Sequence, residues 1–301
     1  MNTEKLEQFH KKHYKKLLII PLLILILALV QIGIQYAQTG DFINKGVSLK
    51  GGISLRIETN YNDIDSLESF LANEFPKEDF DIRSLRQSTG ENALLIEATE
   101  GVGEDNLLNA IKEKLGDQVP DIDEMASSLE LVSSSFSNDF FKTAIKAVLM
   151  AFIFMAIVVF YIYRLLIPSL SVMIAAFTDI VGTIAVYNLL GFNMSAGGIA
   201  ALLMLIGYSV DTDILLNSQV LKNHEGSVFE RMFSAFKTGT MMIFTSMAAV
   251  LVGLIFTKSD VLFEVFLIIL IGLFIDMITT WIQNAGLLMW YLEKKKGVNN
   301  G

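Results

Sequence analysis

A single apolar stretch in the second half of the chain reads AGGIAALLMLIGYSVDTDILL, residues 196–216, and carries two aspartates, Asp211 and Asp213. A transmembrane helix needs about 20 mainly apolar residues, which this stretch supplies. Small residues at its start allow a neighbouring helix to approach closely. The stretch therefore predicts a membrane-spanning helix that carries two acids inside the bilayer.

Outward from this stretch, five further segments are long and apolar enough to cross a membrane. The six predicted spans are residues 17–37, 144–163, 168–189, 196–216, 238–257 and 263–288. The first span follows a lysine-rich tail as a secretory signal would, but a signal peptide has an apolar core of only about 7–15 residues and a cleavage site. We therefore expect an uncleaved anchor at residues 17–37 and a five-helix membrane bundle over residues 143–292.

The composition supports a membrane protein and disfavours several other classes. Of the 301 residues, 52% are hydrophobic and 18% charged, whereas average soluble domains are about a quarter charged. The net charge of −9 disfavours nucleic acid as a partner. With no cysteine and three histidines, the sequence predicts no disulfide, thiolate chemistry or metal site. It also lacks a P-loop motif and a recognisable nucleophile–base pair, so we expect neither an enzyme nor a cofactor.

Basic residues are distributed unevenly over the tails and loops. Twelve lie in the two tails and in the loops on the same side as the tails, whereas the short loops on the other side hold only Lys258. Loops rich in Lys and Arg stay in the cytoplasm. This predicts a multi-pass protein of the cell membrane, with residues 1–16 and 293–301 as cytoplasmic tails and residues 38–142 outside.

Residues 38–142 form a polar segment with 21 acidic and 9 basic residues. Its apolar patterns predict strands at residues 47–59, 80–86, 92–99 and 127–135, helices at residues 64–75 and 103–115, and a turn at residues 88–90. The glycine pair Gly51-Gly52 indicates a bulge or a close backbone approach. The element order is that of the ferredoxin-like split βαβ fold. We therefore expect a polytopic α-helical membrane protein with one α+β ferredoxin-like extracytoplasmic domain.

Four aspartates lie inside the predicted spans: Asp179, Asp211, Asp213 and Asp276. No Lys or Arg lies deep in any span, and a charged carboxylate at the bilayer centre costs about 2.5–3.5 kcal/mol. The four acids therefore cannot all be charged and enclosed. Some are protonated, some face a water-filled seam, or a partner subunit supplies the cations.

Asp211 and Asp213 point in different directions, because two residues rotate a helix by about 200°. The expected neighbours are Ser209 and Asn217 for Asp213, and Gly207 and Tyr208 for Asp211. Two interpretations stay open for every acid in the spans. Each carboxyl is either a hydrogen-bonding group that holds helices together or a group that binds and releases protons.

The segment LIGYSVDTDILL, residues 205–216, resembles the fourth-span motif of the SecD/SecF protein-export family, and its Asp-Thr-Asp form is similar to the archaeal SecF branch. The segment GVSLKGG, from Gly46 to Gly52, resembles the G-x-D-x-x-G-G element that opens the outer domain in that family, with glycines at positions 46, 51 and 52. Six spans with one outer domain after the first also fit. The resemblance therefore covers nearly the whole chain.

The resemblance implies an accessory subunit of protein export within the resistance–nodulation–division superfamily. Such a subunit uses the proton gradient and works with a SecD-like subunit, as a heterodimer, beside the Sec translocation channel that carries exported polypeptides. By position, Asp211 matches the first aspartate of the fourth-span motif, which makes it the leading candidate for proton coupling. Asp213, Asp179 and Asp276 are further candidates.

Two departures limit this transfer. Ser48 stands where the outer-domain motif usually has an acid, and Met241 stands where the bacterial fifth-span motif has an arginine. Two other functions also stay open: a small-molecule or lipid exporter of the same superfamily, and a purely structural stabiliser of the translocon. The exporter is disfavoured because such proteins usually carry two six-span halves.

Overall fold

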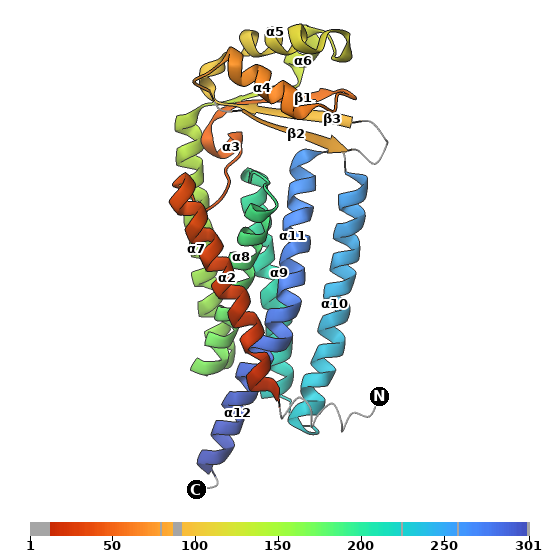
Figure 1. Cartoon of the computed structure of the whole chain (residues 1–301). Helices are drawn as coiled ribbons and strands as arrows, with labels where there is room; N and C mark the ends of the chain where they lie inside the picture. Colours follow the sequence, from red (N-terminus) through yellow and green to blue (C-terminus); the bar gives the residue numbers. More distant parts are fainter. Residues whose placement is uncertain (1–12, 79, 87–91, 224, 258, 300–301) are drawn as a thin grey trace.

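The computed structural model describes residues 13–78, 80–86, 92–223, 225–257 and 259–299. Figure 1 shows a column of long helices with a small sheet domain at one end. Within these described residues, six helices are long and apolar enough to cross a membrane, which confirms the predicted number of spans. Residues 1–12 of the predicted tail at residues 1–16 and the predicted turn at residues 88–90 lie outside the described residues.

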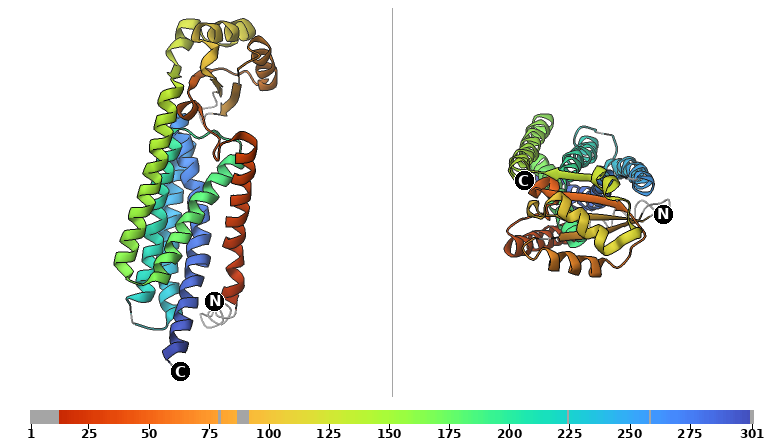
Figure 2. Two further views of the ribbon diagram at one scale, coloured as in Figure 1. Left: turned by 90° about the vertical axis from the view of Figure 1, so that its left-hand side faces the viewer. Right: turned by 90° about the horizontal axis from the view of Figure 1, so that it is seen from above.

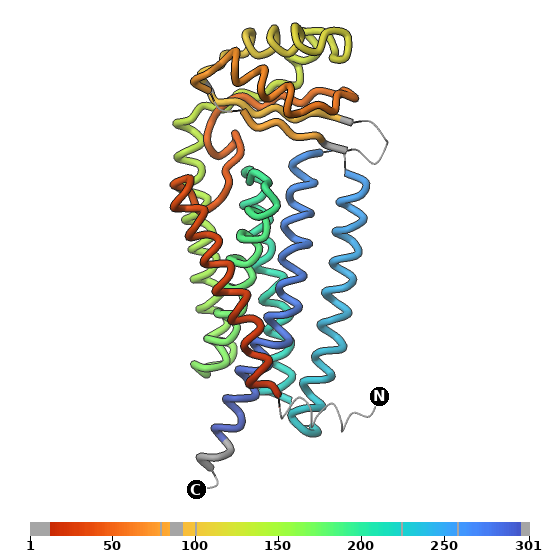
Figure 3. The backbone as a smooth tube through the Cα atoms, in the orientation of Figure 1, coloured from red at the N-terminus to blue at the C-terminus, as the bar shows by residue number. Residues whose placement is uncertain are grey.

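The membrane part consists of α2 (Ile19–Thr39), α7 (Ser134–Tyr163), α8 (Leu166–Leu189), α9 (Ala196–Leu221), α10 (Val228–Phe256) and α11 (Asp260–Ile278), the last of which continues through the π-helical segment η3 (Thr279–Asn284) into α12 (Ala285–Asn299). Helix α8 is central, since most of its side chains are buried and it contacts α2, α7, α9 and α11 (Figure 2). Helices α2 and α7 instead expose large apolar side chains along their length. The start of α2 and the end of α12 lie at the end of the column opposite the sheet (Figure 3).

Several spans are longer than the apolar pattern predicts, because polar turns extend them beyond the apolar run. Helix α7 begins at Ser134, ten residues early, and Ser133 caps its N-terminus. Helix α10 begins at Val228, where Ser227 and Glu230 form a capping box. The sixth helix also extends beyond both of its predicted limits. Hydropathy therefore located the centres of the helices but not their polar ends.

The domain at the sheet end of the helix column, which we call the outer domain for its position beyond the helices, is built on one four-stranded sheet. Its strands are β1 (Gly52–Glu58), β2 (Phe80–Arg86), β3 (Asn92–Ala98) and β4 (Leu129–Val132). They lie in the order β2-β3-β1-β4, and every neighbouring pair is antiparallel. Helix α4 (Ile64–Glu74) connects β1 to β2, while α5 (Glu104–Leu115) and α6 (Ile122–Ser127) lie between β3 and β4. These helices cover the face of the sheet that points away from the membrane helices (Figure 1).

The two faces of the sheet differ in chemistry, because successive residues of a strand point to opposite sides. The face under the helices is apolar and packs against them in one core, which includes Ile53, Leu55, Ile57, Leu67, Ile96 and Leu107. The opposite face carries polar and charged side chains, among them Ser54, Arg56, Arg83 and Glu97. This polar face looks toward the ends of the membrane helices.

The first predicted strand is wrong in its N-terminal part, since Val47–Lys50 form a short helix, α3. Gly51 ends that helix with a φ of 87°, and Gly52 opens β1 with a φ of 137°. A Cβ at Gly51 would lie 2.4 Å from Ser134 Cα, and one at Gly52 would lie 2.2 Å from the Ala98 carbonyl oxygen. The close backbone approach expected at this glycine pair is therefore present.

The last predicted strand, residues 127–135, is also wrong in its extent. Strand β4 covers only Leu129–Val132, the unpredicted helix α6 ends at Ser127 immediately before it, and α7 starts at Ser134. Leu131 is 54% exposed, so the apolar residues of this segment do not all enter the core. The alternating pattern was too short to separate a strand from the ends of two helices.

Candidate functional site

Three of the four membrane aspartates meet inside the helix bundle. Asp179 comes from α8, Asp213 from α9 and Asp276 from α11, and all three side chains are at most 1% exposed. None of them forms an ion pair with a Lys or Arg of the described chain. The structure therefore joins three of the predicted candidates into one buried cluster, and these candidates come from three different spans.

Asp179 is held by two hydroxyl groups from neighbouring helices. Ser209 Oγ donates to Asp179 Oδ2 at 2.5 Å, and Thr279 Oγ1 donates to Asp179 Oδ1 at 2.6 Å. Thr183 Oγ1 also donates to the Asp179 carbonyl oxygen at 2.6 Å. Ser209 thus donates its hydroxyl hydrogen bond to Asp179 and not to Asp213, beside which the sequence predicts it.

Asp213 and Asp276 share one hydroxyl. Thr280 Oγ1 lies 3.1 Å from Asp213 Oδ1 and 3.1 Å from Asp276 Oδ1, so it links the two carboxyls. Asn284 Nδ2 donates to Asp213 Oδ1 at 2.7 Å, and Thr212 Oγ1 lies 3.2 Å from Asp276 Oδ2. The cluster is therefore a hydrogen-bonded network of carboxyl, hydroxyl and amide groups.

Two oxygen atoms of this network have no hydrogen-bond partner. They are Asp213 Oδ2 and Asn217 Oδ1, both buried. The two residues are four positions apart on α9 and so lie on the same face of that helix. Asn217 Nδ2 donates to the Asp213 carbonyl oxygen at 3.1 Å rather than to its carboxyl. A proton on Asp213 Oδ2 would turn this unpartnered acceptor into a hydrogen-bond donor, whereas the amide oxygen of Asn217 can only accept.

The sixth helix brings five polar side chains to the region of the cluster. Its residues Asp276, Thr279, Thr280, Gln283 and Asn284 are all buried. The last four belong to the π-helical segment η3. Such segments are rare and often occur at functional sites. The sequence places Thr279, Thr280 and Gln283 below Asp276, but it does not single out Asn284, which lies eight residues after Asp276 on the same apolar helix.

Asp211, the leading candidate from the sequence, lies apart from this cluster. It is exposed on α9, on the same side as Gly207 and Tyr208, which are also exposed. No atom lies within 4 Å of a Cβ added at Gly207. The opposite orientation of Asp211 and Asp213 is as predicted, but Asp213 is the one that points into the bundle. In this single chain, Asp211 therefore lies on the outer surface of the helix bundle.

The glycine motif of the outer domain connects the two halves of the chain. The Gly46 backbone N–H donates to the Met194 carbonyl oxygen at 2.9 Å, in the loop before α9. Ser48, in the place of the expected acid, accepts a hydrogen bond from the Ala196 backbone N–H at 3.1 Å. The motif thus holds the outer domain against the N-terminal end of the helix that carries Asp213.

The arrangement does not resemble a metal centre. Among the described residues, no group of three or more His, Cys, Asp or Glu side chains is placed to hold a metal ion. The three carboxyls of the cluster are separated by hydroxyl groups rather than converging on one point. What the network can do chemically is hold protons and pass them between oxygen atoms, because each hydroxyl both donates and accepts.

Comparisons with known proteins agree with one another. The family described as "Protein export membrane protein SecD/SecF, C-terminal" matches residues 111–294. The protein-export membrane protein SecF of Pyrococcus furiosus is 33% identical over 98% of this chain and 96% of its own length. SecF of Methanocaldococcus jannaschii is 34% identical over 94% of this chain and 97% of its own length.

The fold is shared with solved structures. One of them is the crystal structure of SecDF, a translocon-associated membrane protein from Thermus thermophilus, with a TM-score of 0.70 and 19% sequence identity. The match covers 92% of this chain but only 38% of the SecDF chain. This likeness shows that the six helices and the outer domain are arranged as in part of that larger protein.

Proposed function

Because the chain belongs to the SecF family of protein-export membrane proteins, we propose that it works with a SecD-type subunit beside the Sec channel, drawing on the proton gradient to assist translocation of polypeptides. The observation that carries the proposal is the buried cluster of Asp179, Asp213 and Asp276. Three carboxyls without a cation are expensive inside a membrane protein, and such groups are usually functional. The proposed role in export rests on membership of the family, and the proposed use of the proton gradient rests on the aspartate cluster.

The network is suited to binding a proton at Asp213. Its Oδ2 atom lacks a partner, as does Asn217 Oδ1 on the same face of α9. A protonated carboxyl gains one donor and loses part of its acceptor capacity, so protonation changes what Thr280 and Asn284 can bond. Because those two residues belong to the sixth helix, a proton at Asp213 alters the contact between α9 and that helix.

The proposed mechanism uses no arginine from this chain. Met241, which stands where the bacterial motif has arginine, is 66% exposed on α10. The cluster instead holds its carboxyls with hydroxyls and amides. Exchange of protons among Asp179, Asp213 and Asp276 would then follow the hydroxyls of Ser209, Thr279, Thr280 and Thr212.

Asp211 supports the proposed heterodimer. An acid exposed in the middle part of a span is unfavourable against lipid, so a second subunit that covers this face and supplies a donor or a cation would remove the cost. Exposed Gly207 beside it would let a partner helix approach closely. A SecD-type subunit is the partner that the family implies. We retain Asp211 as a second coupling candidate, acting across this interface.

The outer domain is proposed to be ferredoxin-like and extracytoplasmic. The strand order β2-β3-β1-β4, with helices connecting β1 to β2 and β3 to β4, supports the fold. The excess of Lys and Arg at the opposite end of the bundle supports the orientation. With both tails in the cytoplasm, the domain would meet polypeptides that leave the channel.

The orientation can be tested because the chain contains no cysteine. A single cysteine at Asn223, in the loop between α9 and α10, should resist an impermeant thiol reagent in intact cells and react in inverted vesicles. A cysteine at Asn109, exposed on α5, should show the reverse pattern. Labelling of position 223 from outside would contradict the proposed orientation.

The coupling can be tested with Asp213→Asn, which keeps the shape of the side chain and removes its proton exchange. Vesicles would contain the chain, its SecD-type partner and the channel, with and without an imposed proton gradient. We expect the variant to assemble normally and to lose the stimulation of export by the gradient. Asp139→Asn, an exposed position on α7, should respond as the parent does.

Two outcomes would speak against this assignment. If Asp213→Asn is stimulated as strongly as the parent, the cluster does not couple export to the gradient. If the variant fails to assemble, the carboxyl holds the helices together and the structural interpretation is correct. Asp211→Asn in the same assay separates the two sites, because loss of stimulation there and not at Asp213 would place coupling at the partner interface.

A further inference from the structure

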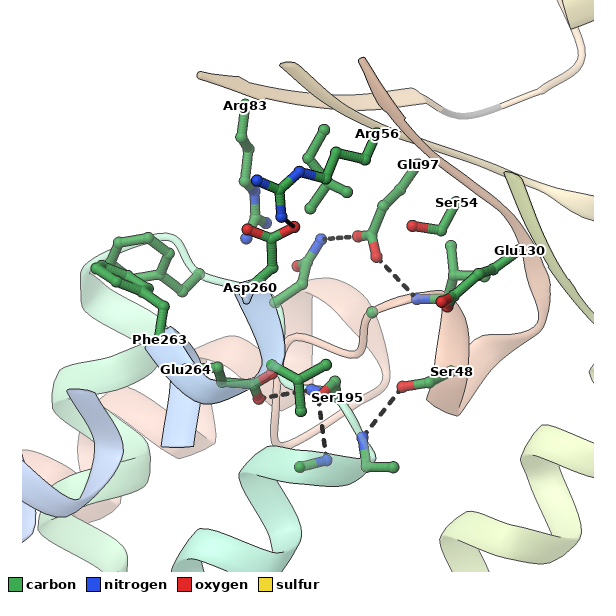
Figure 4. A pocket seen from close by; sticks show the side chains of 18 of the residues that line it. Ser48, Ser54, Arg56, Arg83, Glu97, Glu130, Ser195, Asp260, Phe263 and Glu264 are labelled. Atoms are coloured by element: carbon green, nitrogen blue, oxygen red, sulfur yellow. Dashed lines mark hydrogen bonds and ion pairs between the residues drawn. The ribbon is translucent and has the colours of Figure 1, made fainter. Parts of the chain in front are cut away.

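A cavity of about 620 Å³ lies between the outer domain and the membrane helices. Figure 4 shows it from close by, with the sheet above and the ends of the helices below. Its volume falls within the range of about 300–1,000 Å³ that is typical of ligand pockets. None of the residues proposed above for proton coupling lines it, so it is separate from the aspartate cluster.

The roof of the cavity is the polar face of the sheet. Ser54 and Arg56 come from β1, Glu97 from β3 and Glu130 from β4, and all four point down from the sheet. The roof therefore offers both donors and acceptors. Their spacing is that of neighbouring strands and alternate residues, about 5–7 Å apart.

The floor is formed where α9 and α11 begin. It combines apolar side chains, including Phe192, Val261 and Phe263, with the buried carboxyl of Glu264, which is 8% exposed. Glu264 Oε1 accepts a hydrogen bond from the Ser195 backbone N–H at 2.7 Å (Figure 4). The same two helices carry Asp213 and Asp276 farther along. A molecule in the cavity would thus touch the outer domain and both aspartate-bearing helices at once.

The charges of the lining argue against an anionic ligand. Both lining arginines are already paired: Arg56 Nη1 lies 3.1 Å from Asp260 Oδ2, and Arg83 Nη2 lies 2.6 Å from Asp81 Oδ2. The lining also contains Glu97, Glu130, Asp260 and Glu264, twice as many acids as arginines. A phosphate or carboxylate would therefore meet no unpaired cation and a surplus of negative charge. A neutral or cationic ligand avoids that repulsion.

The uncharged part of the lining suits a peptide backbone. Six serines line the cavity: Ser48, Ser54, Ser84, Ser128, Ser195 and Ser259. The hydroxyls of Ser48, Ser195 and Ser259 accept a hydrogen bond from a backbone N–H and can still donate to a peptide C=O. Ser128 Oγ donates to the Arg56 carbonyl oxygen and can still accept from a peptide N–H. Recognition of this kind does not depend on the side-chain sequence, which suits a site that meets many different polypeptides.

We propose that this cavity binds a short extended segment of an exported polypeptide, with preference for neutral or cationic segments over acidic ones. The proposal rests on the proposed export function, since it takes the exported polypeptide as the ligand. It adds a binding place between the outer domain and the ends of α9 and α11. The backbone of the segment lies along the serine and glutamate groups of the roof, and its side chains meet the apolar floor.

The first measurement is peptide binding to the purified full chain in nanodiscs of neutral lipid. The test peptides are dye-labelled ten-residue peptides of alternating alanine and lysine, alanine and serine, or alanine and glutamate, and empty nanodiscs are the control. Fluorescence anisotropy should show the lysine and serine peptides binding at least tenfold more tightly than the glutamate peptide. Equal or tighter binding of the glutamate peptide, or no binding of any peptide to the chain, would overturn the proposal.

The second measurement fills the cavity from opposite walls. Ser54→Trp adds a bulky side chain from the roof, and Val261→Trp adds one from the floor. If one variant fails to fold, the other still tests the proposal. Asn109→Trp, exposed on α5, adds the same bulk outside the cavity. We expect each cavity variant to weaken binding of the lysine peptide at least tenfold and the control to leave it unchanged. Unchanged binding in a folded cavity variant would place the peptide elsewhere and overturn the proposal.

This test separates the cavity from the coupling site. Peptide binding is measured without a gradient, so Asp213→Asn should keep the parental affinity while losing gradient-dependent export. If cavity filling leaves peptide binding intact but Asp213→Asn loses the gradient response, only the cavity proposal fails. If Asp213→Asn keeps the gradient response but cavity filling abolishes binding, the coupling proposal fails and the cavity proposal stands.

Discussion

The outer domain and the membrane helices arrange their polar groups in opposite ways. The outer domain has a core made of apolar side chains, including Ile53, Leu55 and Leu107, and its charged groups lie on the other sheet face and on the surface. The membrane helices bury Asp179, Asp213 and Asp276 and expose large apolar side chains. One chain therefore contains one part with a dry apolar core and one part with a polar interior.

The difference follows from the solvent around each part. In water, burial of apolar surface contributes about 25 cal/mol per Å² and drives folding. Between helices in a bilayer that drive is absent, because lipid tails are as apolar as leucine, and association depends on packing and hydrogen bonds. Loss of an apolar group should therefore cost most in the outer domain. Loss of a hydrogen bond in the membrane cluster should cost less stability but should alter function.

The largest effect is expected at Gly52, where the outer domain has no room for a side chain. Gly52→Val combines a contact of 2.2 Å with the Ala98 carbonyl oxygen and a backbone φ of 137° that valine rarely adopts. We expect a loss of more than about 4 kcal/mol in the free energy of unfolding of this domain. Hydrogen exchange of the strand amides in the full chain measures it, and the membrane helices should keep their protection.

Gly116 supplies the matched control for that variant. It also has a positive φ, of 57°, but nothing lies within 4 Å of an added Cβ. Gly116→Val should therefore cost only the backbone strain, about 1–3 kcal/mol. Equal losses at Gly52 and Gly116 would mean that the contact with Ala98 does not matter.

The second effect concerns the apolar core. Leu107 is fully buried, and Leu107→Ala should destabilise the domain by about 3 kcal/mol through lost burial and the cavity left behind. Because that core is drawn from residues 53–125, residues 44–137 should fold alone as a mixed α/β domain, in which urea unfolding measures the loss. Leu131→Ala on β4, where the side chain is 54% exposed, should change the stability by less than about 0.5 kcal/mol.

The same contrast explains what the sequence could predict. In the outer domain, water makes the apolar face of each element visible, so α4, β2 and β3 were located within a residue or so. In the membrane, a helix can be apolar on both its inner and its outer face. The sequence therefore showed that Asp211 and Asp213 point in different directions, but not that Asp213 is the buried one.

Other features of the site depend on long-range packing that periodicity does not report. Asn284 lies 71 residues after Asp213 in the sequence and donates a hydrogen bond to it. It belongs to a π-helical segment, which no local sequence pattern predicts. Likewise, the apolar pattern of Val47–Lys50 continues that of β1 and predicts a strand, whereas the Gly51-Gly52 pair changes the direction of the chain and separates the helix α3 from β1. A polar residue on an apolar helix indicates that its side chain has a buried hydrogen-bond partner, but only the tertiary fold determines which residue that partner is.

A smaller effect is expected from one hydroxyl of the membrane cluster. Thr280→Val keeps the shape of the side chain and removes the hydroxyl that lies 3.1 Å from both Asp213 and Asp276. We expect a loss of about 1–2 kcal/mol in stability and a weakened response of export to the proton gradient. Thermal unfolding of the purified complex and export in vesicles measure the two effects.

Thr245 is the control for that variant. Its hydroxyl bonds only backbone carbonyls of its own helix, at 3.0 Å and 2.8 Å, and the side chain is exposed on α10. Thr245→Val should leave both stability and the gradient response as in the parent. If both valine variants behave alike, the hydroxyl of Thr280 does not serve the carboxyl cluster.

The smallest effect is expected where the two parts of the molecule meet. Arg56 on β1 and Asp260 at the start of α11 form a partly exposed ion pair at 3.1 Å. Exposed pairs contribute about 0.2–1 kcal/mol, so Arg56→Ala and Asp260→Ala should each change stability little, and a double-mutant cycle should give a coupling energy in that range. The coupling should fall as salt is raised, since the pair is open to solvent. A coupling energy above about 2 kcal/mol, insensitive to salt, would mean that the outer domain and α11 move as one rigid unit and that the contrast between the two parts ends at this junction.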